Sequence, residues 1–196
     1  RELTGVGFTD CKNAIDENKG DIEKSIEFLR KKGIAKANKK MERVAADGLI
    51  SLSENKNNIS IIEINSETDF VAKNEDFIKF VEEISKLSLS NFGNLKNILK
   101  SKMKNENTVE ENLIALISKI GEKITIRRSD HISAENCINY SYMHSEVKKN
   151  LGKIGVLVSL KTSMKKEDLN TFGKQLAMHV AAVAPMAIDK DSLDKN

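Results

Sequence analysis

Apolar residues recur along the first part of this 196-residue chain at the three- and four-residue spacing of helices. Thr9 and Asp21 stand where helix N-caps are favoured, and Gly20 stands where a helix would end. Three short helices therefore fit residues 1–32, the first being only a helix end before a glycine turn. Residues 33–45 keep the helical spacing and predict a linker helix.

Beyond this linker the apolar residues alternate, and the predicted elements change from helices to strands. Two alternating runs joined by a polar tip predict a hairpin whose second strand is 59–64. A helix over roughly 75–87 follows, capped by Asn74. Two more helices fit 90–121, the second ending at Gly121, and a further strand begins at Ile124. These elements define a first α+β subdomain, predicted over 46–132.

The same order of elements then returns. Residues 138–144 and 154–160 predict a second hairpin with a loop at 145–153, and residues 167–183 predict a helix. Two hairpin-plus-helix units indicate a core of two related α+β subdomains with antiparallel hairpins, the second over 133–196. The predicted fold class is therefore α+β, with a small three-helix N-terminal domain ahead of this core.

The most informative segment is the junction 67–74, which links the predicted strand 59–64 to the helix that follows. It places an acid, Asp69, and an aromatic ring, Phe70, at the end of a sheet. Connections carry binding residues more often than the elements they join. Alternatively, Phe70 fastens the start of the helix to the core, as apolar residues at such junctions do. The local pattern leaves both interpretations open.

Composition sets broad limits on function. Hydrophobic residues make up 39% and charged residues 31%, as in ordinary soluble proteins, and no apolar run approaches the roughly 20 residues of a membrane span. The net charge of +3 is too small to indicate nucleic-acid binding by the whole chain. Cys11 and Cys137 stand in apolar patterns and are expected to be reduced, so we expect a cytoplasmic protein without a signal peptide or membrane partner.

One segment, residues 30–43, is strongly basic, with seven positive residues and one negative. Such a run usually forms a solvated helix face, and Lys36, Lys39 and Lys40 are expected to face solvent. It could instead bind an acidic partner or RNA. No aromatic residues are interleaved for base stacking, so direct nucleic-acid binding is not expected.

No pattern typical of catalysis is visible. His131, His144 and His179 have no second ligand at metal spacing, and no serine lies in a Gly-x-Ser-x-Gly turn. Adjacent Asp130 and His131 would point to opposite faces of a strand. We therefore predict a binding protein rather than an enzyme, with no cofactor and no metal.

Several motifs follow one another in a recognisable order: Thr4-Gly5-Val6-Gly7-Phe8-Thr9-Asp10-Cys11-Lys12-Asn13-Ala14, Ala45-Ala46-Asp47-Gly48, Thr68-Asp69-Phe70-Val71-Ala72, Ile120-Gly121-Glu122 with Ile126-Arg127-Arg128, and Ala177-Met178-His179-Val180-Ala181-Ala182. Together they resemble the signatures of the elongation factor Ts family over essentially the whole chain. In two places the chain departs from the family pattern. Phe8 and Thr9 replace a usual Met pair, and the chain stops at Asn196, where family members continue into a coiled-coil hairpin and a C-terminal module.

The resemblance implies a ubiquitin-associated-like N-terminal domain and a guanine-nucleotide exchange factor that binds elongation factor Tu, in its GDP-bound and nucleotide-free states, and promotes GDP release. An aromatic tip would insert into the Tu nucleotide domain, the N-terminal module would hold a second face, and a histidine of the second subdomain would lie near the tip. The implied partner-binding residues are Asp69, Phe70, Thr68, Val71, Phe8 and His179. The second subdomain would be truncated, and a homodimer is expected only if the missing C-terminal part exists.

Other functions stay open at this point. The chain could be a non-catalytic RNA- or protein-binding adaptor of the translation machinery, and the basic segment 30–43 would then carry the contact. A generic three-helix adaptor joined to an unrelated core would have no effect on nucleotide release by a GTPase. A hydrolase whose catalytic residues meet only in space would be exposed by a substrate screen.

Overall fold

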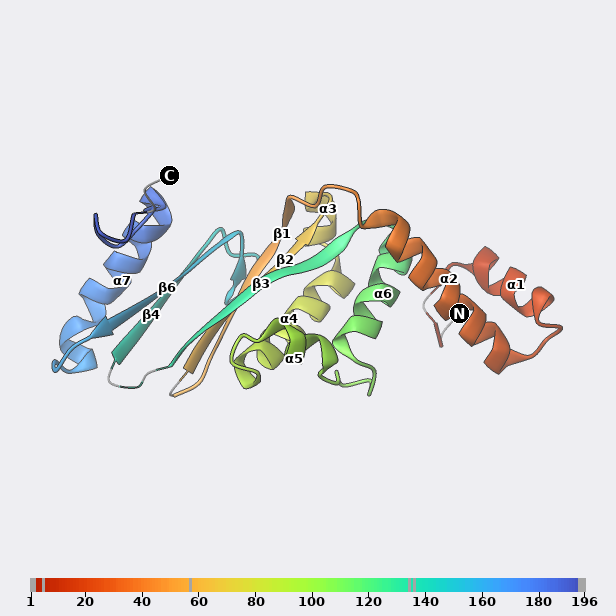
Figure 1. Cartoon of the computed structure of the whole chain (residues 1–196), viewed down its shortest axis with the longest axis horizontal. Helices are drawn as coiled ribbons and strands as arrows, with labels where there is room; N and C mark the ends of the chain where they lie inside the picture. The colour runs from red at the N-terminus through yellow and green to blue at the C-terminus, as the bar shows by residue number, and fades with distance from the viewer. Residues whose placement is uncertain (1–2, 5, 57, 134, 136, 194–196) are drawn as a thin grey trace.

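A computed structural model of the chain describes residues 3–193, apart from residues 5, 57, 134 and 136. The elements in chain order are α1 (Phe8–Glu17), α2 (Ile22–Lys40), β1 (Asp47–Glu54), β2 (Asn58–Ser66), α3 (Asp69–Ala72), α4 (Glu75–Ser90), α5 (Leu95–Lys100), α6 (Val109–Ile120), β3 (Ile124–Ser133), β4 (Cys137–His144), β5 (Leu151–Gly152), β6 (Ile154–Lys161) and α7 (Lys166–Val183). The molecule is elongated, with α1 and α2 at one end, a sheet over helices in the middle, and α7 at the other end (Figure 1). The predicted α+β class is confirmed.

The N-terminal helices differ from the prediction in their bounds. α1 begins at Phe8, after Gly7, rather than being capped by Thr9. Asp21 caps α2 as predicted, because its carboxylate accepts a hydrogen bond from the backbone N–H of Lys24 at 3.0 Å. The expected first helix falls on residues 1–4, of which 1 and 2 lie outside the described residues and the other two form part of a turn. The three-helix domain therefore stays a prediction.

The separate linker helix predicted over 33–45 is corrected, because α2 runs without a break to Lys40. Gly33 lies inside this helix and faces Ser118 where α2 contacts α6. Ala37, one turn further, is buried in the main core. The second half of α2 thus packs on the core while its first half packs on α1.

A four-stranded antiparallel sheet, in the order β3-β2-β1-β5, forms the centre of the molecule. The predicted hairpin is confirmed as β1 and β2, and α4 packs on one face of both strands. Phe77, Val81 and Ile84 of α4 are each 0% exposed and supply much of the core. Asn74 caps α4 as predicted, because its side-chain oxygen accepts from two backbone N–H groups.

The second sheet consists of β4 and β6, with α7 packed on both strands. This confirms the predicted second hairpin and its helix. However, the loop between the two strands returns to the first sheet, where β5 pairs Leu151 with Ser51 of β1. Leu151 is 1% exposed and belongs to the main core. One strand of the predicted second subdomain, β5, therefore belongs to the sheet of the first subdomain, and the predicted division between residues 132 and 133 does not separate the two sheets. Both cysteines are free.

Candidate partner-binding site

The predicted aromatic tip lies on α3, a four-residue helix between the end of β2 and the start of α4 (Figure 1). Phe70 is 78% exposed, whereas its neighbours Val71 and Ala72 are 3% and 2% exposed. The short helix thus buries one side against the core and projects the aromatic ring from the other. Phe70 is a surface residue, and its interpretation as a core staple is wrong.

Val71, rather than Phe70, is the large apolar residue of α3 that packs into the core. It packs in the main hydrophobic cluster, so its side chain is not free to contact a partner. The prediction of Val71 as a partner-binding residue is corrected for this reason. Its burial instead holds α3 on the sheet.

A charged pair flanks the exposed ring. Asp69 accepts a hydrogen bond from the Lys73 ammonium at 2.8 Å, and that ammonium lies 5.9 Å from the centre of the Phe70 ring. The hydrogen bond to Asp69 raises the pKa of Lys73, so this group stays charged. The tip therefore presents an exposed apolar ring beside a cation and an acid.

Thr68 is tied to the protein instead of being presented to solvent. Its backbone N–H donates to Glu122 Oε2 at 3.0 Å and its hydroxyl donates to Oε1 of the same carboxylate at 2.8 Å. A second carboxylate joins the same two segments, because Glu67, next to Thr68, accepts the backbone N–H of Lys123, next to Glu122. This bond lowers the pKa of Glu67, and the nearby Arg43 lowers it further. We call these four residues, Glu67, Thr68, Glu122 and Lys123, the junction clamp.

The end of α2 is fastened to the same loop. The Lys123 ammonium donates to the carbonyls of Met41 and Arg43 at 2.7 and 2.8 Å, and the Lys40 ammonium donates to the carbonyl of Gly121. The loop after α6 therefore holds the tip on one side and the N-terminal helices on the other. Sequence reasoning noted Ile120-Gly121-Glu122 as a motif but assigned it no role, because its partners lie more than 50 residues away.

Phe8 and His179 are both on the surface, but the structure does not gather them around the tip. Phe8 is 71% exposed at the start of α1, and His179 is exposed on α7. Figure 1 shows α1 and α7 at opposite ends of the molecule with α3 between them. Of the six predicted site residues, only the four consecutive ones at the junction lie together.

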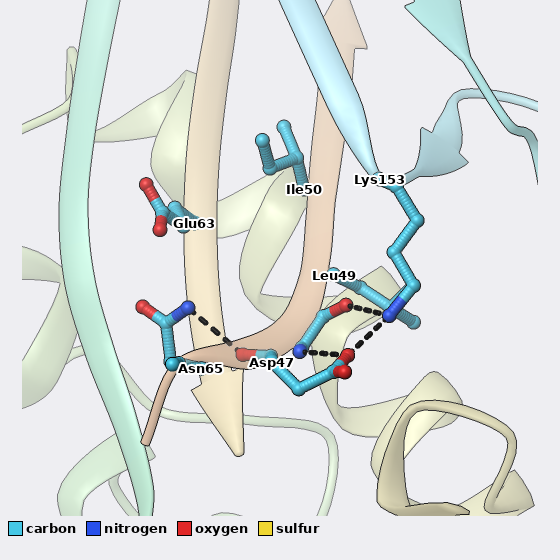
Figure 2. Close-up of a pocket in the computed structure, with 8 residues that line it drawn as sticks. Asp47, Leu49, Ile50, Glu63, Asn65 and Lys153 are labelled. Atoms are coloured by element: carbon cyan, nitrogen blue, oxygen red, sulfur yellow. Dashed lines mark hydrogen bonds and ion pairs between the residues drawn. The ribbon is translucent and has the colours of Figure 1, made fainter. Parts of the chain in front are cut away.

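The last three residues of the Ala45-Ala46-Asp47-Gly48 motif form one wall of a cavity of about 320 Å³ (Figure 2). Lys153 reaches across it from the segment after β5, donating to the Asp47 carboxylate and, at 3.0 Å, to the carbonyl of Gly48. Asn65 donates to the Asp47 carbonyl at 2.8 Å. Hydrogen bonding by Lys153 lowers the pKa of Asp47. These bonds make the motif a joint between the two sheets. Within the described part of the chain, no group of three or more His, Cys, Asp or Glu side chains is placed to hold a metal ion.

The basic segment of α2 is largely engaged within the protein. Lys32 and Lys36 both donate to Asp10 of α1, at 3.0 and 2.9 Å, and Lys40 bonds the loop after α6. Lys39 is exposed as expected, whereas Lys36 and Lys40 are only partly exposed, because these bonds hold their side chains against the protein. Much of the local positive charge has a structural partner, which weakens its interpretation as an RNA site.

Comparison with known proteins identifies the family. The model of the family described as Elongation factor TS matches residues 67–196. The chain belongs to the elongation factor Ts family. It is 45% identical over 196 residues to Elongation factor Ts of Xanthobacter autotrophicus, and 44% identical to those of Methylobacterium sp. (strain 4-46) over 195 residues and Azorhizobium caulinodans over 196.

These alignments cover 99 to 100% of the chain but 64% of each of these three relatives. The chain therefore spans about two thirds of the length of the family members it matches. Across the described residues, no helix is long and apolar enough to cross a membrane.

Proposed function

We propose that this chain is a guanine-nucleotide exchange factor, which binds elongation factor Tu and promotes release of GDP during translation elongation. Membership of the elongation factor Ts family supports the reaction. The observation that carries it on this chain is the 78% exposure of Phe70 on a short helix whose next two residues, Val71 and Ala72, are buried. Burial of this ring against a partner would remove its apolar surface from water and so stabilise the complex.

The proposed mechanism is mechanical rather than chemical. The Phe70 ring and the adjacent Asp69 insert between helices of the Tu nucleotide domain and displace the segments that hold Mg²⁺ and the GDP phosphates. Those phosphate oxygens owe much of their affinity to the metal and to a cradle of backbone N–H groups, so small displacements weaken GDP strongly. No covalent step is needed, and no residue of this chain acts as a catalytic acid, base or nucleophile.

The remaining predicted contacts have supporting roles in this proposal. Phe8, exposed on α1, holds a second face of the Tu nucleotide domain, in a ubiquitin-associated-like N-terminal module. His179, exposed on α7, supplies a third contact from the second sheet. Thr68 acts through the junction clamp rather than by touching Tu. The setting is the cytoplasm, and a homodimer forms only if a C-terminal continuation supplies the contact.

The alternative, an RNA- or protein-binding adaptor of the translation machinery, is supported less well. RNA binding would require the basic face of α2 to be free, whereas three of its lysines bond Asp10 and the loop after α6. An RNA-binding role predicts a salt slope near −0.7 per neutralised phosphate for single strands. A filter-binding titration at increasing salt measures this slope directly.

Release of labelled GDP from elongation factor Tu tests the proposal. Phe70→Ala should slow stimulated release at least about tenfold, while its free energy of unfolding in urea changes by no more than the ±0.5 kcal/mol typical of surface substitutions. Phe92→Ala is the matched control, because Phe92 is also exposed, at 67%, but follows α4 away from the tip. This control should release GDP at the wild-type rate. A Phe70→Ala protein that stimulates release normally would overturn the proposal.

A further inference from the structure

We propose that Glu122 is the positioning residue of the Phe70 tip, an inference that rests on the exchange function proposed above. Glu122 follows α6 in sequence, 54 residues after Thr68, yet its carboxylate takes both hydrogen bonds that Thr68 can donate. Phe70 is only two residues further along the chain. The direction of the ring is therefore set by a carboxylate that belongs to a different element and does not itself lie on the tip.

The start of α3 shows why this carboxylate is needed. Thr68 has the extended backbone of an N-cap residue, with φ −128° and ψ 160°, but its side chain makes no capping bond to the helix. At the start of α6, by contrast, Thr108 accepts the N–H of Glu111 at 3.2 Å in the usual way. The Thr68 hydroxyl donates outward to Glu122 instead. A local cap has been replaced by a long-range contact.

A four-residue helix cannot hold its own shape, because one turn of helix fixes many dihedral angles for very few hydrogen bonds. Two contacts fix α3 in place: burial of Val71 and Ala72 on its inner side, and the Glu122 carboxylate at its entry. Without the carboxylate, the Thr68 carbonyl keeps its bond from the Ser66 hydroxyl at 3.0 Å, but the Thr68 N–H and hydroxyl lose their partner, so the backbone is held less firmly and the ring samples more directions. Activity then falls in proportion to the fraction of molecules that present the ring productively.

The clamp also relates the tip to the N-terminal helices. Lys123, the next residue, donates its backbone N–H to Glu67 and its ammonium to the carbonyls of Met41 and Arg43 at the end of α2. The same three-residue loop therefore fixes Phe70 and the helical module that carries Phe8. Two surfaces held at a fixed spacing bind a rigid partner with less ordering cost than two surfaces on a flexible joint.

The test compares Glu122→Ala with Glu111→Ala in the full 196-residue chain. Glu111 is a matched control, because its carboxylate also accepts the N–H and hydroxyl of a threonine, Thr108, at 2.9 and 3.0 Å. Glu122→Ala should lower the maximal rate of stimulated GDP release roughly tenfold, which corresponds to about 1.4 kcal/mol. Glu111→Ala should lose stability but release GDP at the wild-type rate under conditions in which both proteins are folded.

A second set of variants separates positioning from a general loss of structure. In a Phe70→Ala background, Glu122→Ala should lower GDP release by much less than tenfold, because only Asp69 is left on the tip to position, while its cost in the free energy of unfolding persists. Hydrogen exchange of Glu122→Met, which keeps the length of the side chain but has no oxygen to accept the bond, should show faster exchange at the Thr68 amide and unchanged exchange at Phe77. This measurement also decides the matter if Glu122→Ala does not fold.

The outcomes distinguish the two proposals. If Phe70→Ala slows GDP release and Glu122→Ala does not, positioning by Glu122 is overturned and the exchange function stands. Proportional losses of activity and stability in both glutamate variants would also overturn it, since Glu122 would then be merely structural. If the Phe70→Ala protein stimulates GDP release normally, the proposed exchange function of the Phe70 tip is overturned, whatever the result for Glu122.

Discussion

Two glycines in the middle of helices should respond to the same substitution with opposite signs. Gly33 of α2 and Gly173 of α7 are both buried inside helices, where alanine is intrinsically favoured over glycine by about 1 kcal/mol. A Cβ added at Gly33 would meet Ser118 of α6 at 3.6 Å, an ordinary van der Waals contact. Gly33→Ala should therefore raise the free energy of unfolding by about 0.5 to 1 kcal/mol.

A Cβ added at Gly173 would instead overlap the ring of Tyr140 on β4, lying 2.5 Å from its Cγ and closer still to Cδ2 and Cε2. The ring is 4% exposed and cannot swing out of the way without leaving a void. Overpacking of this kind costs about 1 to 3 kcal/mol, which exceeds the gain in helix propensity. Gly173→Ala should therefore lower the free energy of unfolding by up to about 2 kcal/mol.

Urea unfolding followed by far-ultraviolet circular dichroism measures both values. The control is Tyr140→Ala, because removing the ring should abolish the extra cost of Gly173→Ala and leave only the gain in helix propensity. A Gly173→Ala protein as stable as Gly33→Ala would refute the reasoning, since α7 would then not rest on the Tyr140 ring as described.

Three further predictions concern the core, the partner and pH. Phe77→Ala should destabilise the fold by about 3 to 5 kcal/mol, because Phe77 is 0% exposed, whereas Phe70→Ala should not, and urea melts compare the two. If the chain weakens GDP binding to elongation factor Tu, GDP must weaken its binding to Tu by the same factor, and calorimetric titrations that give equal affinities for GDP-loaded and nucleotide-free Tu would contradict exchange. Hydrogen bonds from Lys36 and then Lys32 hold the pKa of Asp10 below its usual 3.8, so its contribution to stability is present above that pH and is lost as the pH falls through the folded-state pKa. The difference in urea midpoint between wild type and Asp10→Asn should accordingly shrink between about pH 7 and pH 2, and a constant difference would show that the carboxylate charge is not what stabilises the contact.

The elements that the sequence predicted well are those set by local pattern. The hairpin of β1 and β2, the cap at Asn74 and the end of α6 at Gly121 each depend on residues within a few positions of one another. The division of α2 was misplaced because the basic segment 30–43 looked like a separate linker helix. In the structure, Gly33 is a packing position against α6.

The parts that sequence did not reveal depend on distant residues. An exposed Phe70 and a buried one give the same local pattern, and only the burial of Val71 beside it shows which residue enters the core. Glu122 was visible within a motif, but its bonds to Thr68 cross 54 residues of chain. β5 is only two residues long, too short to show an alternating pattern, and only its pairing with β1 reveals it as a strand.

The small strand β5 has a consequence for how the protein is made. Ser51 and its partner Leu151 are 100 residues apart, so on the ribosome β1 emerges long before the segment that pairs with Ile50 and Ser51 on its outer edge. An uncovered strand edge is a template for pairing with other chains, and here that edge also lacks Leu151, a residue of the main core. Nascent chains on the same messenger RNA are therefore exposed to strand-to-strand association until the loop 145–153 has been synthesised and has folded back.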